Sequence, residues 1–378
     1  IGGNERTHDE VIRREFRQFE AAWYDGEKIR LSRNRVDRLG YFKDVGIETV
    51  EVPGAPDQVD LLVTVVEKPT GNLSIGAGVS SAEGLGLQFG FNQDNVFGSG
   101  QSLGVQLNTG KYNRTLVFNN TDPYFTDDGV SRTVDLYQRT SKPYADVDSY
   151  SIESTGSSLR FGVPFTESDT VFVGLGYEQT TVVEGTYLPS AYSTFASEYG
   201  YTVHGFPLTL GWSRDTRDSA LVPSTGRVLR VNSDWSVGGD LGYARATLQY
   251  QQFYPLTKRT TFAFNSEFSS GVSTNGKTYP VMKNYYAGGL GSVRGFQQGS
   301  LTTAAQRTLI DTTSYSVATG GATKLVLNAE VLTPFPGGGN DRTLRMYGFF
   351  DAGGLYDPNA SIALDELRTS VGVGVSLV

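Results

Sequence analysis

A single arginine among glycines, Arg294, is the residue whose setting most clearly requires partners. It stands within residues 285–296, in the longest stretch of the chain that lacks strand periodicity. Glu330 and Asp351 fall on the polar faces of the next two expected strands, so both carboxylates face the same enclosed space. Two carboxylates in a confined space repel each other unless a cation lies between them. A guanidinium can supply that charge as a planar fork.

The sequence therefore predicts an ionic clamp between a loop tip and the wall around it. The clamp residues are Val293, Arg294, Gly295, Phe296, Glu330 and Asp351. Breaking such a group would leave a buried charge unpaired, at a cost of about 3–5 kcal/mol. Replacing either carboxylate should therefore act like replacing the arginine. The alternative is a solvated arginine on an outer loop, and the charge pattern alone leaves both interpretations open.

Covalent chemistry finds little support elsewhere in the chain. Residues 100–104 match the GxSxG pattern of a hydrolase nucleophile, but an alternating strand follows where that motif needs a helix. The two histidines, His8 and His204, lie far apart, and there is no cysteine for thiolate catalysis, metal binding or disulfides. We expect a protein that is not an enzyme and that uses no cofactor and no metal.

Alternation of polar and apolar residues dominates the chain from residue 70 onward. Between residues 244 and 251, alanine, leucine and tyrosine at even positions alternate with arginine, threonine and glutamine at odd positions. Such segments predict strands near residues 73–81, 85–94, 101–110, 114–121, 131–141, 150–163, 170–181, 205–213, 227–237, 243–254, 260–270, 321–332, 343–353 and 367–378. The connection between the eleventh and twelfth strands, roughly residues 271–320, is far longer than a hairpin needs.

This pattern favours a mainly β fold built around a transmembrane antiparallel β-barrel. Polar residues would face the lumen, and apolar residues with aromatic bands would face lipid. A soluble sandwich also alternates, but it does not usually place charged and amide residues on one face of strand after strand. A sheet in lipid must close, because unpaired backbone groups are too costly there.

Charge density divides the chain into two parts. Of the first 69 residues 25 are charged, against 47 of the remaining 309. We therefore expect a small N-terminal domain, residues 1–69, and a barrel, residues 70–378. The net charge of −8 and the lack of Lys/Arg clusters argue against a nucleic-acid partner.

The N-terminal domain is expected to be a small α+β module. Thr7 and Glu10 form a capping-box pattern ahead of a helix with apolar residues as far as Trp23. A second helix is expected over residues 28–39, and strands over 45–52 and 59–67. The module is either a spacer or a sheet whose edge accepts an extended peptide as an added strand.

The chain ends also carry expectations. There is no initiator methionine and no signal peptide, and residues 1–4 resemble the end of a strand, so we expect a fragment of an exported protein. No apolar stretch approaches 18 residues, so no transmembrane helix is expected.

Several segments together resemble the BamA family of outer-membrane β-barrel assembly factors, part of the POTRA-plus-barrel superfamily. The matching segments are RLGYF at residues 38–42, PDQVD at 56–60, NQDNVFG at 92–98, DPYFT at 122–126, YAGG at 286–289, VRGF at 293–296, EVLTP at 330–334 and FDAG at 350–353. The VRGF element is similar across the wider superfamily, whereas PDQVD and DPYFT narrow the resemblance to the assembly branch.

The resemblance implies an outer-membrane barrel of sixteen strands, of which about fourteen are present, preceded by the last POTRA domain in the periplasm of a Gram-negative cell. It also implies a VRGF loop folded into the lumen, with Arg294 gripping Glu330 and Asp351. Such proteins insert other barrels through a weak seam between their first and last strands, without ATP. The chain departs from this family by stopping about two strands short of closure.

The first barrel strand, near residues 71–81, fits the role of the seam. Its expected seam residues are Leu73, Ile75, Gly76 and Gly78. The glycines weaken strand pairing, and a poorly paired edge can template an incoming strand. The implied partners are unfolded outer-membrane proteins, periplasmic lipoprotein subunits of the assembly complex and outer-membrane lipid. A two-partner secretion translocator of the same superfamily and a passive pore are the alternative functions.

Overall fold

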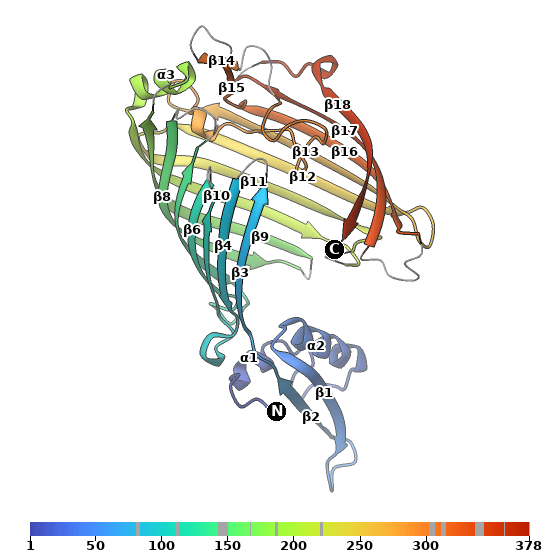
Figure 1. Cartoon of the computed structure of the whole chain (residues 1–378). Coiled ribbons are helices and arrows are strands. Elements are labelled where there is room, and N and C mark those ends of the chain that lie inside the picture. The colour runs from blue at the N-terminus through green and yellow to red at the C-terminus, as the bar shows by residue number, and fades with distance from the viewer. Residues whose placement is uncertain are drawn as a thin grey trace.

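The computed structural model describes residues 1–80, 84–110, 113–142, 150–166, 168–185, 188–219, 222–301, 307–310, 315–336, 344–358 and 360–377. It has a small N-terminal α+β domain and one large, strongly curved antiparallel sheet, joined by a short connection (Figure 1). Among the described residues, no helix combines the length and apolarity that a membrane crossing requires.

The N-terminal domain packs two helices on a two-stranded sheet. Its elements are α1 (Asp9–Arg13), α2 (Gly26–Arg38), β1 (Phe42–Glu51) and β2 (Val59–Glu67). Strands β1 and β2 are antiparallel, and Gly2 adds a parallel bridge to Thr64. Asp25 caps α2 by accepting from two backbone amides, and Gly40 ends it with φ +73°, the left-handed conformation that glycine adopts freely. The order of elements predicted from the sequence is confirmed.

The first helix is much shorter than predicted. It ends at Arg13, no side chain caps it, and Trp23 is 97% exposed instead of packing on the sheet. The capping-box interpretation of Thr7 was therefore wrong. The Thr7 hydroxyl oxygen accepts a hydrogen bond from Asn95 of the barrel, so a contact between domains replaces the local cap.

Among the described residues the large sheet contains fourteen strands, in the order β18-β17-β16-β13-β12-β11-β10-β9-β8-β7-β6-β5-β4-β3. Their bounds are β3 Gly71–Ser80, β4 Gly84–Gln93, β5 Ser102–Thr109, β6 Asn113–Asp122, β7 Ser131–Ser141, β8 Tyr150–Pro164, β9 Asp169–Glu184, β10 Thr202–Asp215, β11 Gly226–Gly239, β12 Tyr243–Pro255, β13 Thr261–Ser273, β16 Thr323–Pro334, β17 Leu344–Tyr356 and β18 Arg368–Leu377. All fourteen predicted strands are confirmed. The GxSxG serine, Ser102, begins β5, as the non-catalytic interpretation requires.

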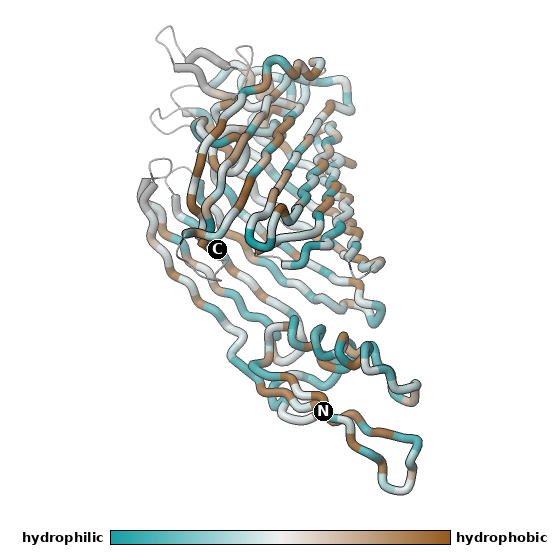
Figure 2. The backbone as a smooth tube through the Cα atoms, turned by 90° about the vertical axis from the view of Figure 1, so that its right-hand side faces the viewer, coloured by the Kyte–Doolittle hydropathy of each residue, from teal (hydrophilic) through white to brown (hydrophobic). Residues whose placement is uncertain are grey.

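Apolar and polar residues alternate along these strands, which Figure 2 shows as bands of brown and teal along the tube. On β16, Leu325, Leu327 and Val331 share one face, while Asn328 and Glu330 share the face toward the lumen. The outer face is rich in exposed apolar side chains, including Leu175 on β9 and Phe350 on β17. This is the surface that a membrane barrel presents to lipid.

The two outermost strands each have one neighbour within the described part of the chain. Strand β3 pairs with β4, and β18 pairs with β17. Both carry apolar residues on the outer face, where Ile75 is 78% exposed and Val373 is 85% exposed. Their backbones therefore present hydrogen-bonding edges to their surroundings.

The long connection between β13 and β16 contains a short 3-10 helix, η2 (Val281–Lys283), and a hairpin of β14 (Arg307–Ile310) and β15 (Tyr315–Ala318). Helix α3 (Ser190–Tyr199), between β9 and β10, lies at the end of the sheet opposite the N-terminal domain (Figure 1). Its Tyr192 and Phe195 share an apolar cluster with Tyr279 and Val281 of the long connection. The first part of the connection is therefore packed against α3, at the end of the sheet opposite the N-terminal domain.

Candidate functional site

Glycines shape the turn that carries Arg294. Gly288, Gly289 and Gly295 have φ angles of +108°, +94° and +84°, which L-residues rarely adopt. The Gly288 amide donates to the Ser292 hydroxyl at 2.7 Å, and the Gly289 amide donates to the Val293 carbonyl at 3.0 Å. The turn thus satisfies its own backbone while its tip projects toward the sheet.

Val293 seats this tip on the lumen face of the sheet. Its side chain is fully buried in an apolar cluster with Ala287, Leu301, Val326 and Leu355. This packing requires a glycine at position 353, because a Cβ added to Gly353 would lie 2.6 Å from the Cγ2 of Val293. Packing therefore fixes the loop before any charge is considered.

Arg294 binds two carboxylates on adjacent strands. Its Nε and Nη2 donate to Asp351 Oδ2 and Oδ1 at 2.7 and 2.6 Å, and its backbone amide donates to Oδ2 at 3.0 Å. Its Nη1 donates to Glu330 Oε1. Asn328, two residues before Glu330 on β16 and paired with Asp351 in the register, donates to Asp351 Oδ1 at 2.9 Å and to the Ser292 carbonyl at 2.6 Å. The arginine is thus held at three nitrogens and by its own backbone.

The two carboxylates differ in surroundings. The Asp351 side chain is 0% exposed, whereas that of Glu330 is 27% exposed. The aspartate depends on protein donors, while the glutamate retains access to water. The aspartate is therefore the more costly partner to lose.

An aromatic stack links Arg294 to the edge strand β18. The guanidinium carbon lies 3.8 Å from the ring centroid of Phe349, within cation–π range. The Phe349 ring also covers Gly372 of β18, where an added Cβ would come within 2.7 Å of it. The clamp thus contacts, through one ring, the strand at the end of the sheet.

The structure brings the predicted clamp residues together. Arg294 lies between Glu330 and Asp351, Val293 is buried beside them, and Phe296 is half-buried against the same cluster. Sequence reasoning missed Asn328 and Phe349 as contacts of the clamp; the alternation of polar and apolar residues along β16, which places Asn328 on the same face as Glu330, was the available signal for Asn328. No group of three metal-ligating side chains occurs among the residues for which positions are given.

The predicted seam residues lie together on β3. Leu73 and Ile75 point outward, opposite Phe91 and Phe89 of β4 in the pairing register. Gly76 and Gly78 alternate with them on the lumen side, and a Cβ at Gly78 would meet no atom within 4 Å. The strand is thus apolar on its outer face, and its inner face lacks side chains at Gly76 and Gly78.

A second group that the sequence did not reveal joins the two domains. Asn95 Nδ2 donates to the Thr7 hydroxyl oxygen at 2.8 Å. The Tyr124 hydroxyl accepts from Arg35 Nη2 at 3.1 Å, and its ring centroid lies 4.3 Å from the Arg14 guanidinium carbon. Asn95 and Tyr124 both lie in segments that carry the family resemblance, which was the available signal.

Glu67 ties the N-terminal segment to the end of β2. Its carboxylate accepts from the backbone amides of Arg6, at 3.0 and 3.2 Å, and of Thr7, at 2.7 Å. Desolvation raises the pKa of Glu67, but hydrogen bonds from the Thr7 hydroxyl and these amides outweigh it and hold the pKa below its usual value. The carboxylate is therefore the form that stabilises this junction.

Together the curved lipid-facing sheet, the lumen clamp and the preceding α+β domain define an outer-membrane barrel of the POTRA-bearing class. Residues 95–378 match the Omp85 superfamily domain, and residues 1–68 match the POTRA family described as a surface antigen variable number repeat. The chain belongs to the Omp85 superfamily. It is an outer-membrane protein whose N-terminal domain faces the periplasm.

The chain is similar to named assembly factors. It is 38% identical to the outer membrane protein assembly factor BamA of Neisseria meningitidis, over 96% of this chain and 47% of that protein. The crystal structure of BamA from Haemophilus ducreyi lacking POTRA domains 1–3 matches with a TM-score of 0.81 and 25% identity, covering 99% of this chain and 76% of that one. CdiB from Acinetobacter baumannii, at 13% identity and a TM-score of 0.64 over 98% of this chain and 66% of that one, shares the fold. The chain spans about half the length of the curated relatives it matches.

Proposed function

We propose that this chain is the barrel and adjoining periplasmic domain of an outer-membrane insertase, the central component of a machinery that folds β-barrel proteins into the outer membrane. The sheet edge at β3 is the observation that carries this proposal. Among the described residues β3 pairs with β4 alone, and its outer face is apolar. The strands that hold the Arg294 clamp, β16 and β17, lie toward the other end of the same sheet. The similarity to named assembly factors supports the same function.

The proposed mechanism is strand templating without covalent chemistry. An incoming strand pairs with β3, whose Gly76 and Gly78 offer no side chains that would hold a competing partner. Leu73 and Ile75, on the outer face of β3, keep the apolar face of the growing sheet toward lipid. The clamp holds the loop inside the lumen, so the sheet keeps its curvature while the seam opens.

The proposed organisation places the last POTRA domain at residues 1–69 and the barrel at residues 70–378, in a sixteen-stranded family barrel. The periplasmic domain captures nascent strands by edge pairing. Its partners are unfolded outer-membrane proteins, periplasmic lipoprotein subunits and outer-membrane lipid. No nucleic acid takes part.

Barrel insertion into liposomes tests the function. The full-length protein should accelerate folding of an unrelated outer-membrane barrel, and Arg294→Ala should lose most of that acceleration. A secretion translocator or a passive pore is the better assignment if the unaltered protein fails to accelerate insertion. Steady conductance that is independent of Arg294 would favour the pore.

Site-specific crosslinking tests the templating strand. A photoreactive residue at Ile75, on the outer face of β3, should crosslink to a substrate strand that stalls during insertion. The matched control is Val231, an outward residue on the interior strand β11, which has neighbours on both sides. Equal crosslinking at the two positions would contradict templating at this edge.

A further inference from the structure

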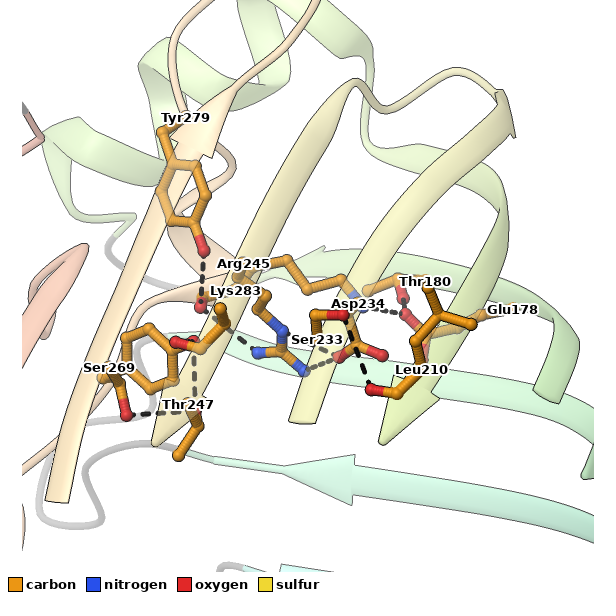
Figure 3. Close-up of polar contacts among 12 residues, drawn as sticks. Glu178, Thr180, Leu210, Ser233, Asp234, Arg245, Thr247, Ser269, Tyr279 and Lys283 are labelled. Carbon is orange, nitrogen blue, oxygen red and sulfur yellow. Dashed lines mark hydrogen bonds and ion pairs between the residues drawn. The ribbon is translucent and has the colours of Figure 1, made fainter. Parts of the chain in front are cut away.

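A second ion pair anchors the long connection inside the barrel, away from the Arg294 clamp. Lys283, the last residue of η2, places its Nζ 2.5 Å from Glu178 Oε1 on β9 (Figure 3). The two side chains are 12% and 19% exposed, so water screens the pair weakly. The pair joins segments 105 residues apart in the sequence.

Both partners are held in place by further hydrogen bonds. The Tyr137 hydroxyl donates to Glu178 Oε2 at 2.8 Å, and the Thr180 hydroxyl donates to Oε1 at 3.3 Å. The backbone carbonyl of Lys283 accepts from the Tyr279 hydroxyl at 3.1 Å. Figure 3 shows Thr180 beside Glu178 and Tyr279 reaching the backbone of Lys283.

An arginine on β12 completes this cluster. Arg245 Nη1 donates to the same Lys283 carbonyl at 3.4 Å, while its Nε and Nη2 donate to Asp234 Oδ2 on β11 at 2.9 and 2.7 Å. The charge of Arg245 is thereby satisfied by its own partner, which leaves Glu178 to Lys283. The lysine is therefore bound at its ammonium and at its backbone.

This pair lies several strands away from the Arg294 clamp in the sheet. Glu178 lies on β9, whereas the partners of Arg294 lie on β16 and β17, and β13, β12, β11 and β10 stand between them in the sheet. One connection therefore grips the sheet at two separated places. Removing one partner of a buried pair leaves an uncompensated charge, so each grip resists release.

We propose that Lys283 and Glu178 form a second clasp, and that the two clasps make the connection a chord across the lumen that fixes the curvature of the sheet. Apolar packing supports the same geometry, because Val281 and Tyr279 sit in one cluster with Tyr192 of α3. The chord holds the β9 region at a set distance from β16 and β17. If the chain is an insertase, as proposed above, the clasp also positions the edge strands for insertion, because it fixes the curvature of the sheet.

Distance measurement between spin labels tests the chord independently of insertion. Labels go on cysteines introduced at Thr194 of α3 and at Ser361 after β17, both exposed. The printed chain has no cysteine, so no residue within it competes for the label. The variants Lys283→Met and Glu178→Gln, in the full-length protein in liposomes, should widen the distance distribution. The charge exchange Lys283→Glu with Glu178→Lys should narrow it again.

The matched control is a second lysine pair that stays within the wall. Lys324 Nζ lies 2.9 Å from Glu267, with exposures of 12% and 23%, but these residues belong to the adjacent strands β16 and β13. Lys324→Met should leave the distribution unchanged. The chord is refuted if both clasp variants keep the narrow distribution, or if the control widens it equally.

Folding and activity are separated by the same set of proteins. If Lys283→Met does not fold, as judged by gel mobility before and after heating, Glu178→Gln decides, because its amide oxygen still accepts from Tyr137. If the unaltered protein does not insert barrels, the proposed function is refuted, but the distances between the spin labels still test whether Lys283 and Glu178 fix the curvature of the sheet. Widened distances with an undiminished insertion rate would overturn only the proposal that the clasp positions the edge strands for insertion.

Discussion

Neutralising the two clamp carboxylates one at a time should give unequal effects. Asp351→Asn removes the charge that faces three nitrogens of Arg294, counting its backbone amide, and turns an amide donor toward other donors. Glu330→Gln removes a charge that faces one nitrogen. Both changes keep the shape of the side chain, so the comparison isolates charge and hydrogen bonding.

The magnitudes follow from burial. Asp351 is 0% exposed, so its loss breaks a buried pair, at about 3–5 kcal/mol. Glu330 is 27% exposed and makes one contact, so its loss should cost about 1–2 kcal/mol. Since about 1.4 kcal/mol is a factor of ten, the undocked loop should become roughly 150- to 4,000-fold more populated in Asp351→Asn, and roughly 5- to 30-fold in Glu330→Gln.

Trypsin cleavage after Arg294 measures the undocked population directly. The peptide bond is protected while the guanidinium lies in the clamp, and cleavage follows the open fraction when opening is fast. Cleavage after Arg259, on the exposed turn between β12 and β13, serves as an internal reference that neither variant should change. The proteins are compared in detergent and in liposomes.

Equal cleavage rates in the two variants would refute the reasoning from burial. Unchanged rates in both would refute the clamp itself. Faster cleavage at Arg259 as well would indicate a general loss of the barrel, and the difference between the carboxylates would then carry no support.

Three further predictions concern packing and the domain junction. Gly353→Ala should release the loop, because its Cβ would lie 2.6 Å from Val293, an overpacking of about 1–3 kcal/mol that faster cleavage after the clamp arginine would report. Asn95→Ala should destabilise the junction by about 1–2 kcal/mol, because it removes the hydrogen bond to Thr7 and places alanine in a left-handed backbone conformation. Limited proteolysis of residues 68–71 should therefore become faster. Glu67→Gln should remove the pH dependence of the stability of this junction. Because the pKa of Glu67 is lowered in the folded protein, its carboxylate stabilises the junction above the usual glutamate pKa, and this stabilisation is lost as the pH falls through the pKa of the folded state. Amide hydrogen exchange of the N-terminal segment measures the effect.

Matched variants control these three changes. Gly348→Ala adds a Cβ whose nearest neighbour lies 4.0 Å away, so it should leave the loop docked. Asn92→Ala and Glu51→Gln alter exposed residues near the same elements. Undocking of the loop in Gly348→Ala would contradict the first prediction. Proteolysis of residues 68–71 that is no faster in Asn95→Ala would contradict the second. Loosening of the junction at acid pH that persists in Glu67→Gln would contradict the third.

Strand positions were predicted well because each strand carries its own signal. Residues 59–67 were predicted as a strand and observed as β2 with the same bounds, and all fourteen barrel strands were placed near their observed positions. Lipid outside and water inside impose alternation on every strand separately. Such a signal needs no knowledge of distant neighbours.

The first helix shows where this local reasoning ends. Thr7 and Glu10 match a capping-box pattern, yet no side chain caps α1, because Thr7 is engaged by Asn95 and Glu67. A competing contact about 90 residues away in sequence replaced the local one. Local patterns do not record such competition.

By itself, the sequence determined the barrel class, the strand positions and the residues able to form a clamp, because alternation and charge are written along the chain. Only the tertiary structure decided that Asp351 is the buried partner and Glu330 the hydrated one, and that Lys283 of the long connection pairs with Glu178 of β9. The reason is physical: burial and pairing depend on which strands and loops the curved sheet brings together, and sequence spacing does not specify those distances.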